Sequence, residues 1–165
     1  MILSRNVGRV RVTRVAIACQ GGGSHTAFTA GVLKRLLGAQ ELDGYEVVGL
    51  SGTSGGAVCA FFIWYALRKG DACVWKRLMD FWADNTAQSP QERLFNDAVI
   101  KTLESISRGV MPQYSVSPAN PMLQAWLSLA TQGMRSQFTD FRQLLEAHID
   151  FSELARWGAL PEPPI

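Results

Sequence analysis

The sequence predicts an α/β fold built around a parallel sheet. A β-branched, apolar run ends at Cys19 and leads directly into three glycines. A second such run, residues 45–50, ends in another glycine-rich corner, and an apolar pattern of helical spacing follows each corner. Strands that alternate with helices in this order pair in parallel, because each helix returns the chain to the start of the next strand.

The first predicted strand covers residues 10–19. Alternating Val and Arg at its start give way to a continuous apolar run, which is typical of a strand entering a buried parallel sheet. A helix is then expected over 28–37, with Gly38 as its stop. Residues 45–50 form the second strand. The helix expected over 57–69 is apolar nearly all round, which indicates burial.

Helices separated by prolines are predicted for the remaining chain. The first is capped by Asp71 and bears Trp75, Leu78, Met79 and Trp82. The others are expected over 92–107, 122–130 and 140–149, the last capped by Thr139. Four tryptophans in this part of the chain could line an acyl site or a membrane face, although tryptophan at helical spacing is more often a core residue. They are Trp75, Trp82, Trp126 and Trp157.

Length and composition favour one domain. The 165 residues, 47% of them hydrophobic, suffice for a single compact core. Sheets usually have about 4–6 strands, however, and two strands are predicted here. The proline-rich segment 161–165 reads as a linker. We therefore interpret residues 1–165 as the N-terminal portion of one domain, cut short before its sheet is complete.

Charge and cysteine content narrow the function classes. A net charge of +2 does not single out a nucleic-acid partner. Cys19, Cys59 and Cys73 have no metal-ligand spacing and are interpreted as free thiols in a reducing compartment, with no metal site. The longest apolar run, 57–67, is shorter than the ~18 residues that indicate a spanning helix. We expect a cytoplasmic protein.

The N-terminal segment carries four arginines, Arg5, Arg9, Arg11 and Arg14, and the first acidic residue is Glu41. A basic arm of this kind suits anionic lipid head groups or a transit peptide. A solvated strand with outward-facing arginines is the simpler interpretation, and peripheral contact with a membrane stays open.

A nucleophile elbow is predicted at Ser54. The corner Gly52-Thr53-Ser54-Gly55-Gly56 fits G-x-S-x-G, with a predicted strand before it and a helix after it. Glycines are needed beside the serine because the turn is sharp and side chains there would clash. The serine hydroxyl is then exposed at the start of a helix, where developing negative charge is favoured.

The other glycine corner, Gly21-Gly22-Gly23, predicts an oxyanion loop. Successive glycines let backbone N–H groups converge on an anion. A phosphate cradle is the competing interpretation. The dinucleotide fingerprint fails because Thr26 stands at its last glycine, and no Gly-Lys-Ser/Thr end indicates a P-loop. Donors beside a nucleophile favour catalysis.

These two motifs together resemble those of patatin-like phospholipases. Residues 18–33 resemble the glycine-rich opening of the family, and 49–57 resemble its Gly-Thr-Ser-Ala/Gly-Gly-Ala elbow. Weaker similarity continues through 81–82 and 117–121 to 150–151. The chain departs from the family at His25, where many members have arginine, and at Thr26, where glycine is common.

The resemblance implies a three-layer α/β fold and hydrolysis of lipid acyl esters by a Ser–Asp dyad, without metal or organic cofactor. Ser54 carries over as nucleophile, and the amides of Gly22 and Gly23 carry over as oxyanion donors, with Gly21 shaping the turn. The aspartate does not carry over, since nothing after Ser54 matches the family's Asp-Gly-Gly or Asp-Gly-Ala motif. Asp43-Gly44 precedes the elbow and is interpreted as a turn.

Several alternatives stay open. A Ser-His-Asp esterase would use His25 or His148 as base. For His148 the acid would be Asp80, Asp84, Asp97 or Asp140. An acyltransferase would use the same elbow. A catalytically inactive fragment and a phosphate-binding module are the non-enzymatic alternatives.

Overall fold

The computed structural model describes residues 12–38, 44–112, 117 and 119–158. The chain divides into two compact units. The first comprises Met1–Asp80 and Ser152–Ile165, and the second comprises Phe81–Phe151. Both candidate motifs belong to the first unit.

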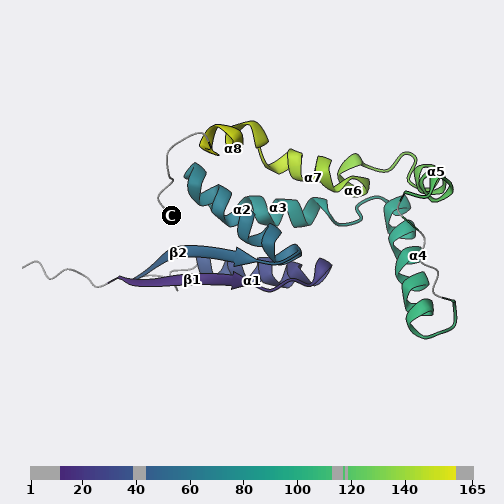
Figure 1. The fold of residues 1–165 in the computed structure, drawn as a ribbon, viewed down its shortest axis with the longest axis horizontal. Coiled ribbons are helices and arrows are strands. Elements are labelled where there is room, and N and C mark those ends of the chain that lie inside the picture. Colours follow the sequence, from purple (N-terminus) through teal and green to yellow (C-terminus); the bar gives the residue numbers. More distant parts are fainter. Residues whose placement is uncertain (1–11, 39–43, 113–116, 118, 159–165) are drawn as a thin grey trace, which may run out of the picture. The chain divides into compact units, whose positions relative to one another are not determined.

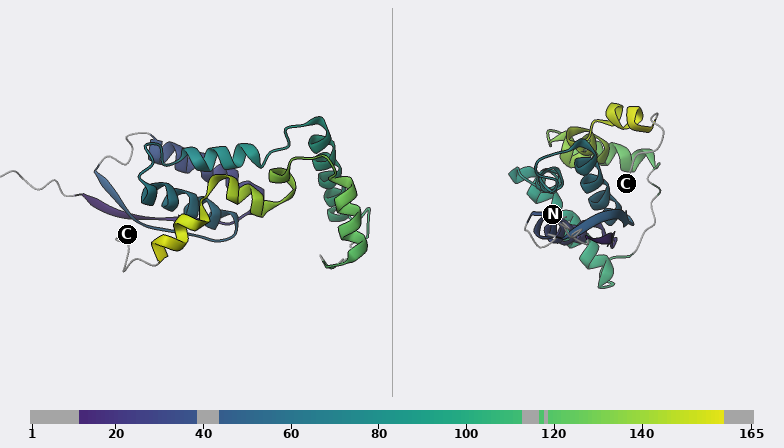
Figure 2. Two further views of the ribbon diagram at one scale, coloured as in Figure 1. Left: turned by 90° about the horizontal axis from the view of Figure 1, so that it is seen from above. Right: turned by 90° about the vertical axis from the view of Figure 1, so that its left-hand side faces the viewer.

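A two-stranded parallel sheet organises the first unit. Strand β1 (Thr13–Cys19) and strand β2 (Tyr45–Gly52) lie side by side (Figures 1 and 2). A short 3₁₀ turn, η1 (Gly23–His25), and helix α1 (Thr26–Gly38) connect them. Helix α2 (Gly55–Lys69) follows β2. The predicted α/β class with a parallel sheet is confirmed.

The pairing of the two strands contains one irregularity. Thr13–Val15 lie opposite Tyr45–Val47, and Ala16–Cys19 lie opposite Gly49–Gly52. Val48 is therefore an extra residue in β2, as in a β-bulge. Both strands nevertheless end level with each other, so the loops that follow them start at the same edge of the sheet.

Strand β1 is covered on one face. Cys19 is buried and Val15 and Ile17 are half-buried, whereas Ala16 and Ala18 are exposed. The continuous apolar run predicted burial on both faces. The difference arises because the described elements cover one face of the sheet, and alanine side chains lie on the other.

Helix α2 is the core of the first unit. It contacts both strands and α1, and its buried side chains include Cys59, Phe62 and Ile63. Leu67 is 45% exposed, so the burial predicted from the all-round apolar pattern is confirmed only in part. Gly70 ends the helix in a left-handed conformation, with φ of 74°. Helix α8 (Phe151–Gly158), which the sequence analysis missed, is joined to α2 by the hydroxyl of buried Tyr65, which donates to Glu153 Oε2 at 2.8 Å.

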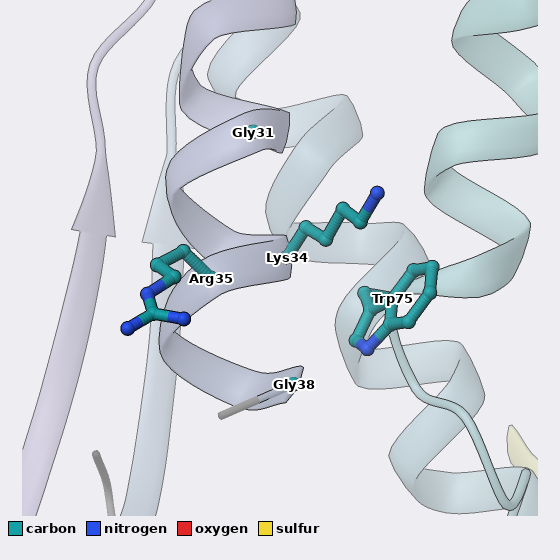
Figure 3. A pocket seen from close by; sticks show the side chains of 5 residues that line it. All are labelled: Gly31, Lys34, Arg35, Gly38 and Trp75. Atoms are coloured by element: carbon teal, nitrogen blue, oxygen red, sulfur yellow. The ribbon is translucent and has the colours of Figure 1, made fainter. Parts of the chain in front are cut away.

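Trp75 packs at the end of α1 (Figure 3). It lines a pocket of about 360 Å³ with Gly31, Lys34, Arg35 and Gly38. The Lys34 Nζ lies 5.0 Å from the centre of its ring. The lining residues on α1 begin at Gly31, five residues after Thr26, so the pocket belongs to the C-terminal part of α1 and not to the glycine loop.

Helix α3 (Lys76–Asp84) starts later than predicted. Asp71 does not cap it; the Asp71 carboxylate instead accepts a hydrogen bond from Arg77 Nε. Asp71 lies too far before Lys76 to reach the first N–H groups of the helix, so the prediction of the cap is wrong.

Four further helices lie in the part of the second unit that the structure describes. They are α4 (Pro90–Ser107), α5 (Pro121–Ala130), α6 (Ser136–Thr139) and α7 (Phe141–His148). Asp140 caps α7 by accepting from Arg142 N at 2.8 Å, whereas Thr139 ends α6, so the predicted cap was misplaced by one residue. No helix in the described ranges has the length and apolarity that crossing a membrane requires.

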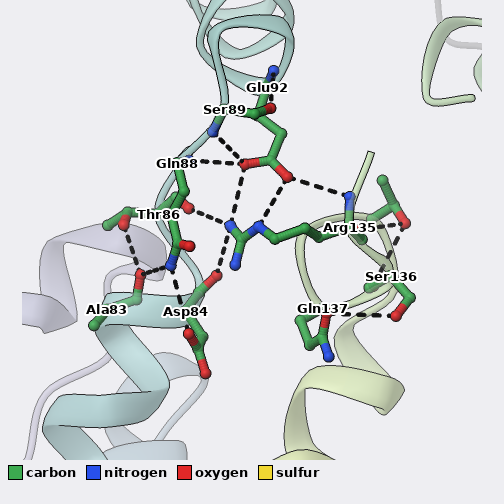
Figure 4. A network of polar contacts seen from close by, with 10 residues as sticks. Ala83, Asp84, Thr86, Gln88, Ser89, Glu92, Arg135, Ser136 and Gln137 are labelled. Atoms are coloured by element: carbon green, nitrogen blue, oxygen red, sulfur yellow. Dashed lines mark hydrogen bonds and ion pairs between the residues drawn. The ribbon is translucent and has the colours of Figure 1, made fainter. Parts of the chain in front are cut away.

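A buried carboxylate ties the second unit together (Figure 4). Glu92 is 0% exposed, and its Oε2 accepts from Gln88 N at 2.7 Å and Ser89 N at 3.1 Å. Arg135 Nε donates to Oε1 at 2.9 Å, and Arg135 Nη2 donates to Thr86 O at 2.8 Å. The Arg135 guanidinium and then the backbone N–H groups hold the pKa of Glu92 at about 2.

Most of the basic N-terminal segment lies outside the described residues, as do Arg5, Arg9 and Arg11. Arg14 is exposed on β1, and its Nε lies 3.8 Å from Glu46 Oε2 on β2. This position agrees with the interpretation of Arg14 as a solvated, outward-facing strand residue.

Candidate active site

The two glycine-rich loops are in direct contact. A Cβ on Gly21 would lie 2.7 Å from Thr53 O and 3.3 Å from Ser54 Cβ, closer than real Cβ atoms approach. Glycine at this position therefore allows the loop after β1 to touch the corner after β2. The structure thus brings Gly21–Gly23 together with Gly52–Gly56, as the sequence analysis expected.

Ser54 has an unusual backbone conformation. Its φ is 50° and its ψ is −129°, and it is the one non-glycine residue of positive φ in the described ranges. Such a conformation costs on the order of 1–3 kcal/mol and is concentrated at functional sites. The side chain of Ser54 is exposed. Ser54 is the N-cap residue of α2, and its backbone oxygen accepts a hydrogen bond from Ala57 N at 3.0 Å.

The sharpness of this corner explains its glycines. A Cβ on Gly52 would lie 2.5 Å from Gly56 O, and one on Gly56 would lie 2.5 Å from Gln20 O. These obstacles are backbone atoms, which cannot move aside. The G-x-S-x-G spacing is therefore a steric requirement of this turn, and Gly56 also lets α2 start against the end of β1.

Thr26 fills the space between the two loops. Its Oγ1 donates to Gly23 O at 2.6 Å, and the residue is buried. A Cβ on Gly55 would overlap Thr26 Oγ1 and would lie 2.8 Å from Gly23 O. Sequence reasoning noted Thr26 as a departure from the family and missed this contact, since no local pattern connects Thr26 with Gly55.

The glycine loop is closed by a 3₁₀ turn in which His25 N donates to Gly22 O at 3.1 Å. Gly23 has φ of 55°, a conformation that favours glycine. Helix α2 begins at Gly55, and its next two N–H groups have acceptors in the corner, since Gly56 N donates to Thr53 O at 2.9 Å and Ala57 N donates to Ser54 O at 3.0 Å. The positive end of the α2 dipole lies at the Ser54 corner and favours negative charge there.

The buried thiols lie next to this corner. Cys59 Sγ donates weakly to Thr26 O at 3.5 Å. The Cys19 carbonyl lies where a Cβ on Gly56 would be placed. Burial raises the pKa of the Cys19 thiol, which keeps it in the unreactive protonated form. Cys19 and Cys59 are buried, whereas Cys73 is half-buried.

The two candidate histidines belong to different units of the chain. Within the described residues, Ser54 Oγ forms no hydrogen bond to a His, Asp or Glu side chain. His25 is exposed. His148 belongs to the second unit, where its Nε2 lies 3.1 Å from Asp84 Oδ2 and its ring lies 6.2 Å from that of Phe81. Of the acids considered for His148, the contact shown is with Asp84.

The other acids considered for a triad have local roles. Asp80 Oδ2 accepts from Lys76 Nζ one turn earlier in α3, and Asp140 caps α7. Asp97 lies within α4.

A groove of about 520 Å³ runs from the same corner along β2. Consecutive residues, Gly49–Gly52, line it on one side, so it follows the edge of the strand. Ala57, Ala60, Phe61 and Trp64 line it from α2. The groove is mainly apolar and begins next to the Ser54 turn.

Comparison with known proteins agrees with this arrangement. The family model described as Patatin-like phospholipase matches residues 17–164. Neither a curated protein nor a solved structure matches the chain. The matched range contains both glycine corners and most of the chain. The chain therefore belongs to the patatin-like phospholipase family, whose members act on lipids.

Proposed function

We propose that this chain carries the nucleophile and the oxyanion donors of a lipid acyl hydrolase. The observation that carries the proposal is the strained Ser54 turn in contact with the glycine loop. In the reaction, Ser54 Oγ bonds to the ester carbonyl carbon while its proton passes to a base. The base then gives this proton to the leaving oxygen as the tetrahedral intermediate expels the alcohol. Water attacks the acyl-enzyme carbonyl, giving its proton to the base, and the acid is released as Ser54 Oγ is protonated again.

Oxyanion stabilisation falls to backbone N–H groups in this proposal. The amides of Gly22 and Gly23 are the donors that family resemblance implies. The Gly55 N–H is a third candidate, because the residue after the nucleophile commonly supplies a donor. Thr26 supports them indirectly by holding Gly23 O and filling the space against Gly55.

The proposed reaction also needs a general base to accept the proton of Ser54 Oγ. A serine hydroxyl needs an adjacent base for efficient attack, and Ser54 Oγ contacts no such side chain within the described residues. Gly44, of the Asp43-Gly44 pair, has φ of 84°, which suits the turn predicted there. We propose that the base is an aspartate from outside the described residues, and that the 165-residue chain alone turns over esters poorly.

The test is labelling with a fluorophosphonate followed by intact-mass measurement. We expect slow labelling of the folded chain, since the oxyanion donors remain while the base is lacking, and the rate should rise steadily with pH. Ser54→Ala should abolish the added mass. Ser51→Ala, at an exposed serine three residues earlier, is the matched control and should label as the wild type does.

Equal labelling of the wild type and Ser54→Ala would exclude Ser54 as the nucleophile. Rapid labelling that depends on Ser54 and levels off near neutral pH would instead show that a base acts within this chain. Variants of His25 and His148 would then identify it.

A further inference from the structure

One face of helix α5 is apolar and uncovered. Met122, Trp126 and Leu129 recur at positions i, i+4 and i+7, so they share one side of the helix. Their exposed fractions are 83%, 59% and 72%. The sequence analysis interpreted Trp126 as a core residue, and the structure overturns that interpretation. We call these three residues the α5 stripe.

The helix is formed without help from this face. Asn120 caps it, since its Oδ1 accepts from Met122 N at 2.9 Å and from Leu123 N at 3.2 Å. Pro121 stands at the first helical position, which suits its fixed φ. On another side of α5, Leu123 and Ala130 are half-buried. Local capping therefore presents the α5 stripe outward on an ordered helix.

The composition of α5 bears on what binds there. Its ten residues, PMLQAWLSLA, include no charged side chain. Protein interfaces achieve specificity through placed polar and charged groups around an apolar centre, and this helix offers only Gln124 and Ser128. A helix of ten residues is also only about 15 Å long, which is short for the ~1,200 Å² or more that a stable pairing of two copies buries.

We propose that the α5 stripe docks on a phospholipid surface. Trp126 suits the boundary between head groups and acyl chains, because its ring is apolar and its indole N–H stays near water. Met122 and Leu129 would enter the acyl region on either side of it. The choice of lipid as the occupant rests on the proposed function, since a lipid hydrolase must reach a substrate held in a surface.

The first test measures binding to vesicles, in the full chain carrying Ser54→Ala so that no lipid is consumed. The chain is floated with phosphatidylcholine vesicles. The double variant Trp126→Ser/Leu129→Ser should partition at least about tenfold less well. The matched control, Ile100→Ser/Leu103→Ser, removes two exposed apolar side chains from α4, 46% and 60% exposed, and should bind as before. Circular dichroism checks that helix content is retained.

The second test locates the contact. Phosphatidylcholine brominated in its acyl chains should quench the tryptophan fluorescence of the bound chain. Trp126→Phe should keep vesicle binding and lose most of the quenching, because the ring that enters the lipid is no longer fluorescent.

The results separate this proposal from the catalytic one, because vesicle binding is measured without a nucleophile. Failure of the Ser54→Ala chain to float with vesicles would overturn it. An equal loss of binding in the α4 control would overturn it as well, since binding would then be unspecific. A dimer in sedimentation that Trp126→Ser/Leu129→Ser converts to monomer, without vesicle binding, would assign the α5 stripe to a second copy.

Discussion

Replacement of Glu92 by glutamine tests how the second unit is held together. The Glu92 carboxylate accepts from two backbone N–H groups before α4 and from the Arg135 side chain. Glutamine keeps one oxygen but turns the other into an NH₂ group. That group faces N–H donors, so one set of hydrogen bonds is lost and the positive charge of Arg135 is left without its partner.

The expected loss follows from the pKa of Glu92, which falls from its ordinary 4.5 to about 2. Each pKa unit corresponds to about 1.4 kcal/mol, which sets an upper limit of about 3 kcal/mol. The Arg135 side chain is 29% exposed, so water screens part of the interaction. We therefore expect Glu92→Gln to lower the free energy of unfolding by about 2 kcal/mol at neutral pH.

The pH dependence has a definite sign. Because folding lowers the pKa of Glu92, its stabilisation is fully present above about pH 4.5, the value in the unfolded chain, and is lost as the pH falls toward 2. Urea unfolding followed by circular dichroism should show the largest difference between wild type and variant at pH 7. Roughly half of that difference should remain at pH 3.

The matched control is Glu146→Gln in the same unit. Glu146 Oε1 lies 2.7 Å from Arg142 Nε, but both side chains are largely exposed, so little change in stability is expected. Similar losses in the two variants, or a difference that does not shrink between pH 7 and pH 3, would refute the reasoning from burial and charge.

Three predictions concern the Ser54 corner. Gly55→Ala places a Cβ against Thr26 Oγ1 and Gly23 O, so it should lower the free energy of unfolding by about 2 kcal/mol and stop fluorophosphonate labelling. Its control is Gly31→Ala in α1, where a Cβ meets nothing within 4 Å; this change should raise the free energy of unfolding by about 0.5–1 kcal/mol. Thr26→Val removes the hydroxyl that donates to Gly23 O. Thr26→Val should lower the free energy of unfolding by about 1 kcal/mol and slow fluorophosphonate labelling. Thr26→Ser keeps the hydroxyl and should retain the wild-type stability and labelling rate. Ser54→Gly should be about 1 kcal/mol more stable in thermal unfolding than Ser54→Ala, because glycine adopts a φ of 50° without strain.

These predictions have clear contrary results. Normal labelling of Gly55→Ala would show that the contact between the loops is not needed for reactivity. Equal labelling rates for Thr26→Val and Thr26→Ser would remove the hydroxyl from the account. A Ser54→Ala variant at least as stable as Ser54→Gly would mean that the Ser54 backbone is not strained.

The first unit was largely predictable because its signals are local. A β-branched run before glycines and a helical pattern after them are readable from neighbouring residues, and β1, α1, β2 and α2 all lie close to the predicted ranges. Burial of β1 was less predictable, because it depends on which elements cover the strand.

In the candidate site, too, the residues fixed by local geometry were predictable from the sequence, and the contacts made by tertiary packing were not. Ser54 and the glycines could be found because each occupies a turn whose geometry restricts residue type locally. The contact of Thr26 with Gly55 joins residues far apart in sequence, and it depends on the pairing of β1 with β2. The exposure of Trp126 is likewise a tertiary property, since the same helical spacing serves a core and a surface.

The extra residue in β2 sets the alignment of the two loops. One strand residue advances the chain by about 3.3 Å, which is close to the length of a hydrogen bond. With Val48 present, Cys19 lies opposite Gly52; a chain without Val48 would shift the serine corner by one step along the glycine loop. The alignment of the Ser54 corner with the glycine loop therefore depends on the number of residues in β2, and we expect single-residue insertions or deletions there to be more damaging than most substitutions.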